Sequence, residues 1–255
     1  MLGVAFTKRT AGVDPGFYAA EAAGLRWLAS AGPGAAPAVE VLDVGGDHIV
    51  LEQLSPGRPT VQTAAAFGRA LHRTHRAGAA AFGSPPPGRP ESGYIGRQAM
   101  AMRPTAEWGT FYAEQRVLPY ARAARDRDHL SPRAAVLVER VCERLAAGAF
   151  ADDEPPARLH GDLWSGNVFW TDTAAVLIDP AAHGGHPLTD LAMLDLFGTP
   201  HLPAILEAYT EAAGWDFDWQ DLLGLHQLHP LLVHAVSHGP AYGNEAERVA
   251  RRYAG

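Results

Sequence analysis

The chain has 255 residues, of which 47% are hydrophobic and 19% charged, so it can bury a core of one large domain or two lobes. A formal net charge of -7 without a basic stripe argues against nucleic acid as the main partner, and the single cysteine, Cys142, excludes an internal disulfide. No apolar run is long enough to span a bilayer, and Lys8 and Arg9 come too early for a signal-peptide core. We therefore expect a cytoplasmic protein without a membrane partner.

The first 54 residues predict a small, strand-rich N-terminal lobe. The first expected strand is apolar and ends in a cation, Lys8, and a helical apolar pattern follows it. Two further strand-like runs are joined by a Gly45-Gly46-Asp47 turn typical of a hairpin. The expected elements are a strand over residues 4–8, a helix over 17–30, and strands over 39–44 and 48–51. We place the lobe boundary after Leu54.

From residue 55 to residue 255 the pattern becomes mainly helical. The expected helices cover residues 64–78, 108–125, 132–148, 189–197, 202–213 and 219–238. A short β insert, residues 159–170 and 175–178, interrupts them. The sequence thus predicts an α+β fold with a small β-rich N-lobe, residues 1–54, and a large helical C-lobe, residues 55–255.

The β insert carries the residues that point to chemistry. Asp162 precedes Asn167 by five residues, the interval of the protein-kinase pattern H-R-D-x-x-x-x-N, and Asp179 follows twelve residues later at the end of an apolar strand. Phosphoryl transfer needs a carboxylate that orients and deprotonates the attacking hydroxyl, and oxygen ligands for Mg²⁺ on the phosphates. We expect Asp162 to be the catalytic base, and Asn167 and Asp179 to bind Mg²⁺. An Asx-rich turn between two strands is the structural alternative, but it does not explain the joint spacing.

Lys8 is the only lysine beside 20 arginines. A compact ammonium suits a site where a guanidinium fork does not fit, although a single surface lysine can also remain by chance. Glu21, on the following helix, is placed to pair with Lys8 and aim it at the phosphates of ATP. Glu52 and Leu54 fall where the link between the lobes would offer backbone groups to the adenine.

Several runs resemble the fructosamine (ketosamine) kinase family. They are HGDLWSGN from His160, IDPA from Ile178, DLAM from Asp190, YIG from Tyr94, W-x-x-F-Y-x-E-Q-R from Trp108 and LHQLHPLLVH from Leu225. They follow one another in order over nearly the whole chain.

This resemblance implies a protein-kinase-like fold, related to aminoglycoside phosphotransferases, that uses ATP and Mg²⁺ to phosphorylate a sugar hydroxyl of a ketosamine or glycated amine. It also implies that Trp164 and His160, beside the expected base, contact the substrate. For Trp164, a core position that pins the loop remains equally open.

Kinases of this type carry a Gly-rich hairpin before the lysine strand, and only three residues precede Val4 in this sequence. We therefore expect an N-lobe without that hairpin, either because the start has been misassigned or trimmed or because the protein is a natural variant that clamps the nucleotide weakly. Two other functions stay open: a kinase for another aminosugar, aminoglycoside or choline-type amine, and a nucleotide-binding pseudokinase.

Overall fold

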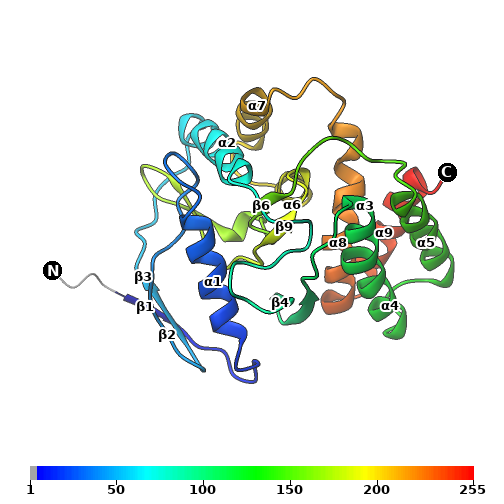
Figure 1. Cartoon of the computed structure of the whole chain (residues 1–255), viewed down its shortest axis with the longest axis horizontal. Helices are drawn as coiled ribbons and strands as arrows, with labels where there is room; N and C mark the ends of the chain where they lie inside the picture. The colour runs from blue at the N-terminus through cyan, green and yellow to red at the C-terminus, as the bar shows by residue number, and fades with distance from the viewer. Residues whose placement is uncertain (1–4) are drawn as a thin grey trace. The chain divides into compact units, whose positions relative to one another are not determined.

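The computed structural model describes residues 5–255, so Val4, the first residue of the first expected strand, lies outside the described residues. Internal packing divides the chain into two compact units, whose elements are labelled in Figure 1. The first unit runs to Pro104 and also contains Pro156–Asp216, and the second contains Thr105–Pro155 and Phe217–Gly255. The lobe boundary expected after Leu54 lies inside the first unit and stays a prediction.

An antiparallel sheet with the order β1-β3-β2 begins the first unit. Its strands are β1 (Ala5–Lys8), β2 (Val41–Val44) and β3 (Ile49–Glu52). In the central strand, Ile49 and Leu51 are buried and alternate with half-buried neighbours, as expected when one face of a sheet is covered. The register places Lys8 opposite Ile49, at the end of an edge strand.

Helix α1 (Phe17–Ala29) covers this sheet (Figure 1). Its side chains Tyr18 and Leu25 belong to the same buried core cluster as Ile49 and Leu51. Burial of this apolar face holds the helix in one orientation on the sheet. Glu21, on the same helix, is therefore held close to the end of β1.

Helices α2 (Val61–Arg76) and α7 (Leu202–Ala213) pack closely within the first unit. The side chain of Thr60 caps the first turn of α2 by accepting from the Thr63 backbone N–H at 3.1 Å. At Gly68 an added Cβ would lie 2.2 Å from the carbonyl oxygen of Ile205, so only glycine permits this approach of the two backbones.

Short antiparallel pairs of strands precede, contain or follow the expected catalytic loop in the chain. Strand β6 (Ala157–Leu159) pairs with β9 (His183–Gly185), β7 (Val168–Trp170) with β8 (Ala175–Leu177), and β4 (Ser92–Ile95) with β5 (Gln98–Ala101). Helix α6 (Leu188–Phe197) follows β9, and its side chains through Leu194 are buried all round. Sequence analysis predicted the β6–β8 region but neither β9 nor the β4–β5 hairpin.

The second unit is helical. It contains α3 (Trp108–Phe111), a π-helical turn over Tyr112–Val117, α4 (Leu118–Asp126), α5 (Pro132–Ala146), α8 (Gln220–His238) and α9 (Pro240–Tyr253). Helix α8 packs against α4 and α9, and α5 also packs against α4 and α9; these helices are labelled in Figure 1. Sequence analysis did not predict α9.

The helix expected over residues 108–125 exists, but its hydrogen-bonding pattern changes before Pro119. Proline has no N–H to donate to the Gln115 carbonyl four residues back. That carbonyl instead accepts from Nη1 of Arg116 at 3.1 Å. Within the second unit, the missing donor explains why the wider π turn occurs at this point.

Candidate active site

The loop after β6 depends on a glycine. Gly161 has a φ of +81°, and a Cβ there would lie 2.3 Å from the carbonyl oxygen of Ala181. After Asp162 the chain makes a 3-10 turn over Ser165–Asn167 and enters β7. This tight path brings Asn167 back to Asp162.

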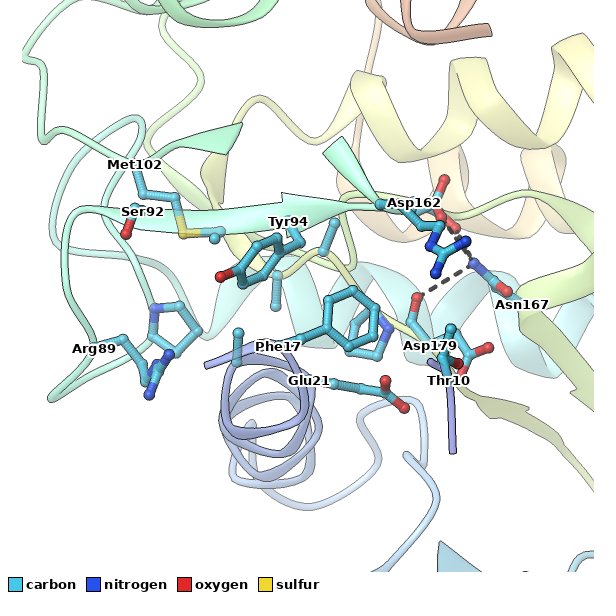
Figure 2. Close-up of a pocket in the computed structure, with 18 of the residues that line it drawn as sticks. Thr10, Phe17, Glu21, Arg89, Ser92, Tyr94, Met102, Asp162, Asn167 and Asp179 are labelled. Carbon is cyan, nitrogen blue, oxygen red and sulfur yellow. Dashed lines mark hydrogen bonds between the residues drawn. The ribbon is translucent and has the colours of Figure 1, made fainter. Parts of the chain in front are cut away.

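The side-chain amide of Asn167 holds the loop together. Its Nδ2 donates to the Asp162 backbone oxygen at 2.8 Å and to the Asp162 carboxylate at 3.2 Å, and it also contacts the Asp179 backbone oxygen at 3.3 Å (Figure 2). These bonds engage only the nitrogen end of the amide. The oxygen, Oδ1, therefore remains available as a ligand for a cation in the cavity that Asn167 lines.

Asp162 lies in surroundings that disfavour its charge. Burial raises the pKa of its carboxyl to about 7; the negative charges of Asp190 and Asp179 add to this rise, and the hydrogen bond from Asn167 opposes it. A carboxylate with this pKa accepts a proton near neutral pH far more readily than an ordinary aspartate does. This property suits a general base.

Lys8 joins two carboxylates from different parts of the chain. Its Nζ lies 2.8 Å from Oδ1 of Asp179 and 3.0 Å from Oε2 of Glu21. Asp179 follows β8 with a φ of +52°, in the left-handed region that aspartate tolerates better than most residues. The three side chains thus come together from β1, α1 and the turn after β8.

The charges of this cluster affect one another. Burial disfavours the Lys8 ammonium, but Glu21 and Asp179 outweigh burial and raise the pKa of Lys8. Burial also raises the pKa of Glu21 to about 7, against the opposing effect of Lys8. Lys8 therefore stays charged over the whole physiological range.

A buried carboxylate on α6, that of Asp190, forms hydrogen bonds with the backbone of the catalytic loop. Asp190 accepts from the backbone N–H of His160 at 2.8 Å and of Gly161 at 2.9 Å, and from Nε2 of His75 at 3.1 Å. The hydroxyl of Tyr209 lies 2.7 Å from the other nitrogen of His75. Burial alone would raise the pKa of Asp190, but the bonds from His75 and the loop hold it below its ordinary value.

Sequence analysis noted Asp190 only within a family run and missed His75 and Tyr209. One signal was present: an acidic residue inside the stretch 188–194, which is otherwise apolar except for Thr189, has to find buried donors. Nothing in the sequence indicated which donors these would be.

A cavity of about 370 Å³ opens over these residues (Figure 2). Lys8, Glu21, Asp162, Asn167 and Asp179 line it, together with residues that the sequence did not indicate as site residues. These further residues include Phe17, Arg89, Tyr94, Arg97 and Met102. The charged cluster is thus open to a small molecule rather than sealed in the core.

The remaining predicted residues lie in different places. Trp164 lines the cavity and is 42% exposed, so it does not pin the loop from the core. His160 is fully buried, and its Nε2 donates to the Ile178 carbonyl at 2.9 Å. Its side chain therefore links the start of the catalytic loop to the segment after β8. Glu52 and Leu54 are not among the described residues that line this cavity. The roles predicted for all of these residues stay predictions.

Solved structures place the fold in a known class. The chain aligns with an aminoglycoside phosphotransferase, solved in complex with ADP and hygromycin B, at a TM-score of 0.62 and 14% identity over 92% of this chain and 84% of that one. A choline kinase from Streptococcus pneumoniae aligns at a TM-score of 0.62, with 14% identity, over 98% of this chain and 86% of that one. The chain therefore has the protein-kinase-like α+β fold of two lobes that the sequence predicted.

Proteins with higher sequence identity indicate which family within this fold class the chain resembles. A structure described as a "putative fructosamine-3-kinase" from Thermobifida fusca aligns at a TM-score of 0.89, with 44% identity, over 98% of this chain and 85% of that one. A "probable ketoamine kinase" from Thermus thermophilus is 34% identical over 89% of this chain and 79% of its own length. A second one, from Enterococcus faecium, is 29% identical over 97% of this chain and 87% of its own length.

Residues 4–254 match the fructosamine kinase family, and the chain belongs to that family. It is accordingly a phosphotransferase, and its family acts on amine-linked sugars. In the part of the chain that the structure describes, no helix is both long and apolar enough to cross a bilayer.

Proposed function

We propose that this chain is an ATP- and Mg²⁺-dependent kinase that phosphorylates a sugar hydroxyl of a ketosamine. The observation that carries the proposal is the convergence of Asp162, Asn167, Asp179 and Lys8 on one cavity. These residues come from the catalytic loop, the turn after β8, and β1. A purely structural ion cluster would not need to line a cavity large enough for a small molecule.

Asp162 acts on the acceptor hydroxyl. With a pKa of about 7, its carboxylate accepts the hydroxyl proton while the oxygen attacks the phosphorus. The bond from Asn167 Nδ2 fixes the carboxylate, and the Asp190 bonds fix the loop backbone beneath it. Positioning accounts for most of the catalysis in this kind of transfer, so a rigid loop matters as much as the proton itself.

The donor set fits a nucleotide and its metal. The Asn167 amide oxygen and the Asp179 carboxylate are two oxygen ligands of the type that Mg²⁺ prefers. Lys8 offers an ammonium that Glu21 holds in place beside Asp179. When bound, Mg²⁺-ATP supplies the phosphoryl group and neutralises the charge that develops on it.

The family and its relatives support the substrate class. Two relatives are named as ketoamine kinases, and the aligned aminoglycoside phosphotransferase was solved with ADP bound. Trp164, on the cavity wall beside Asp162, offers an aromatic face to a sugar ring. A ketosamine thus places its sugar against Trp164 and one hydroxyl against Asp162.

A substrate panel tests this proposal. The protein is incubated with Mg²⁺-ATP and, separately, a ketosamine, an aminoglycoside and choline, and phosphorylated products are identified by mass spectrometry. We expect phosphate on the sugar of the ketosamine, and no product when EDTA removes the metal. If choline or the aminoglycoside is phosphorylated and the ketosamine is not, the chain would be assigned to another small-molecule kinase activity.

A further inference from the structure

The cavity has a second, cationic end that the proposed chemistry does not use. In Figure 2, Arg89 lies on the opposite side of the drawn pocket from Asp162 and Asn167, with Tyr94 and Phe17 between them in this view. Arg89 comes from the loop before β4, and Tyr94 from β4 itself. This end is therefore built by an insert separate from the catalytic loop.

A rigid turn presents Arg89 to the cavity. Its backbone N–H donates to the Pro86 carbonyl at 3.1 Å, and the two central residues of that turn are Pro87 and Gly88. Gly88 has a φ of +76°, which together with the preceding proline is the pattern of a type II turn. Because proline restricts the backbone on both sides of Arg89, the guanidinium is presented from a stiff support.

The guanidinium of Arg89 is short of partners. Its Nε is buried without a hydrogen-bond acceptor, and its Nη2 has only a long contact, 3.5 Å, to the Gly16 carbonyl. Among residues 5–255 no carboxylate pairs with it; Asp14 lies near the adjoining Tyr94 hydroxyl, whose pKa is raised by burial and, to a smaller extent, by Asp14. Because the Nε is buried, the end of the guanidinium, Nη1 and Nη2, is the fork that can bind a carboxylate through two parallel bonds.

Charge changes sign along the cavity. Three carboxylates, Glu21, Asp162 and Asp179, accompany one ammonium at the reactive end, whereas Arg89 lies at the opposite end (Figure 2). A ketoamine made from an amino acid has the matching order: a sugar, then a secondary ammonium, then a carboxylate. A simple glycated amine has no carboxylate to offer Arg89.

We infer that Arg89 binds a carboxylate on the amine half of the ketoamine, so that the preferred substrate is a glycated amino acid. This inference rests on the proposed function, because it takes the sugar to lie at Asp162. It adds a specificity-determining residue outside the catalytic loop.

The test compares matched ligands by binding, without ATP. Ketoamines of ω-amino acids of increasing length, from glycine to aminohexanoate, are each paired with the corresponding amide, and affinities are measured by calorimetry. For the length that fits, we expect the acid to bind about 10–100-fold more tightly than the amide, the usual gain from a charged hydrogen bond. Arg89→Gln should bring this ratio to within about threefold of one, and Arg89→Lys should keep only part of it.

The control variant and the contrary results are judged by the same quantity, the affinity of the acid divided by that of the amide. Arg26→Gln, an exposed arginine of α1 that does not line the cavity, should keep the wild-type ratio. A wild-type ratio near one at every length, or a ratio unchanged in Arg89→Gln, would overturn the inference. The inference would also be overturned if Arg89 increased the affinity only for amide ligands whose sugar carries a phosphate, because Arg89 would then bind the phosphate and not a carboxylate. Absence of turnover in the wild type, with the binding ratio intact, would instead overturn the proposed function alone.

Discussion

Burial of the ionised Asp162 carboxyl lowers the free energy of unfolding of the protein. Its pKa rises from 3.8 to about 7 in the folded protein, chiefly because burial disfavours its charge. Between these two values the folded state binds a proton more readily than the unfolded state does. The free energy of unfolding contributed by this group therefore falls as pH rises through that window.

Removing the charge should stabilise the protein. Asp162→Asn keeps an oxygen that accepts from Asn167 and eliminates the buried charge, so the variant should melt at a higher temperature than the wild type at about pH 8. Each kcal/mol of relief corresponds to roughly 2–4 °C in a chain of this size. At about pH 5.5 the wild-type carboxyl is protonated in the folded state but ionised in the unfolded state, so the difference should be smaller than at pH 8; it should vanish only below the ordinary pKa of 3.8. Asp153→Asn, at an exposed position, should show no such pH dependence, and a gain at pH 5.5 equal to that at pH 8 would contradict the account.

Lys8 permits a chemical test because no other lysine is present. Its ammonium is paired with Glu21 and Asp179 and its pKa is raised, so an amine-selective reagent should modify it more slowly than a free lysine at the same pH. Mg²⁺-ATP should slow this modification further if Lys8 contacts the phosphates. Peptide mass spectrometry gives the rate, and equal labelling with and without saturating Mg²⁺-ATP would count against a nucleotide site here.

The residues of the cluster were predictable to different degrees. Asp162, Asn167 and Asp179 follow a spacing that one loop and one strand explain, and Lys8 was distinguished by being the only lysine. Arg89 is one of 20 arginines, and its lack of a partner is a property of the folded packing alone. No periodicity or spacing reports such a property.

At the scale of elements, α6 and α2 fix the catalytic loop through Asp190. That carboxylate accepts two loop N–H groups and one from His75, and all four groups are buried. Because both of its oxygens are engaged, an amide in its place would turn an NH₂ group toward existing donors. The link from α6 to the loop is thus specific to a carboxylate.

Asp190→Asn should therefore destabilise the protein by about 3–5 kcal/mol, the cost of removing one partner of a buried charged group. Urea unfolding measures this loss. Glu211→Gln, at an exposed carboxylate of the neighbouring α7, should change the free energy of unfolding by less than about 0.5 kcal/mol. A loss below 1 kcal/mol for Asp190→Asn would show that the loop is held by other contacts.

The long helices were more predictable than the short strands. The pattern predicted a helix over residues 17–30 and another over 202–213, close to the observed α1 and α7, because apolar side chains recur over several turns. Strand β9 has only three residues, two of them glycines, and its pairing with β6 is a long-range contact. The β4–β5 hairpin likewise turns at Gly96-Arg97 without an extended apolar alternation on either side.

At the scale of the whole molecule, the compact unit that carries the cavity is discontinuous in sequence. Residues 105–155 leave it and pack with 217–255 instead. The predicted boundary after Leu54 followed a change of composition, which reports local structure and not which distant segments pack together. The order of elements was therefore accessible from the sequence, whereas their grouping into units was not.

The central claim is that Asp162 and its neighbours transfer a phosphoryl group to a ketosamine. The most direct test is the rate of phosphate transfer from saturating Mg²⁺-ATP to a ketosamine, followed by mass spectrometry for the wild type and Asp162→Asn. The account predicts a phosphorylated sugar for the wild type and a rate lower by about 10²–10⁴-fold for the variant, the usual contribution of a general base. Equal rates for the two proteins, or nucleotide binding by the wild type without any transfer, would contradict it.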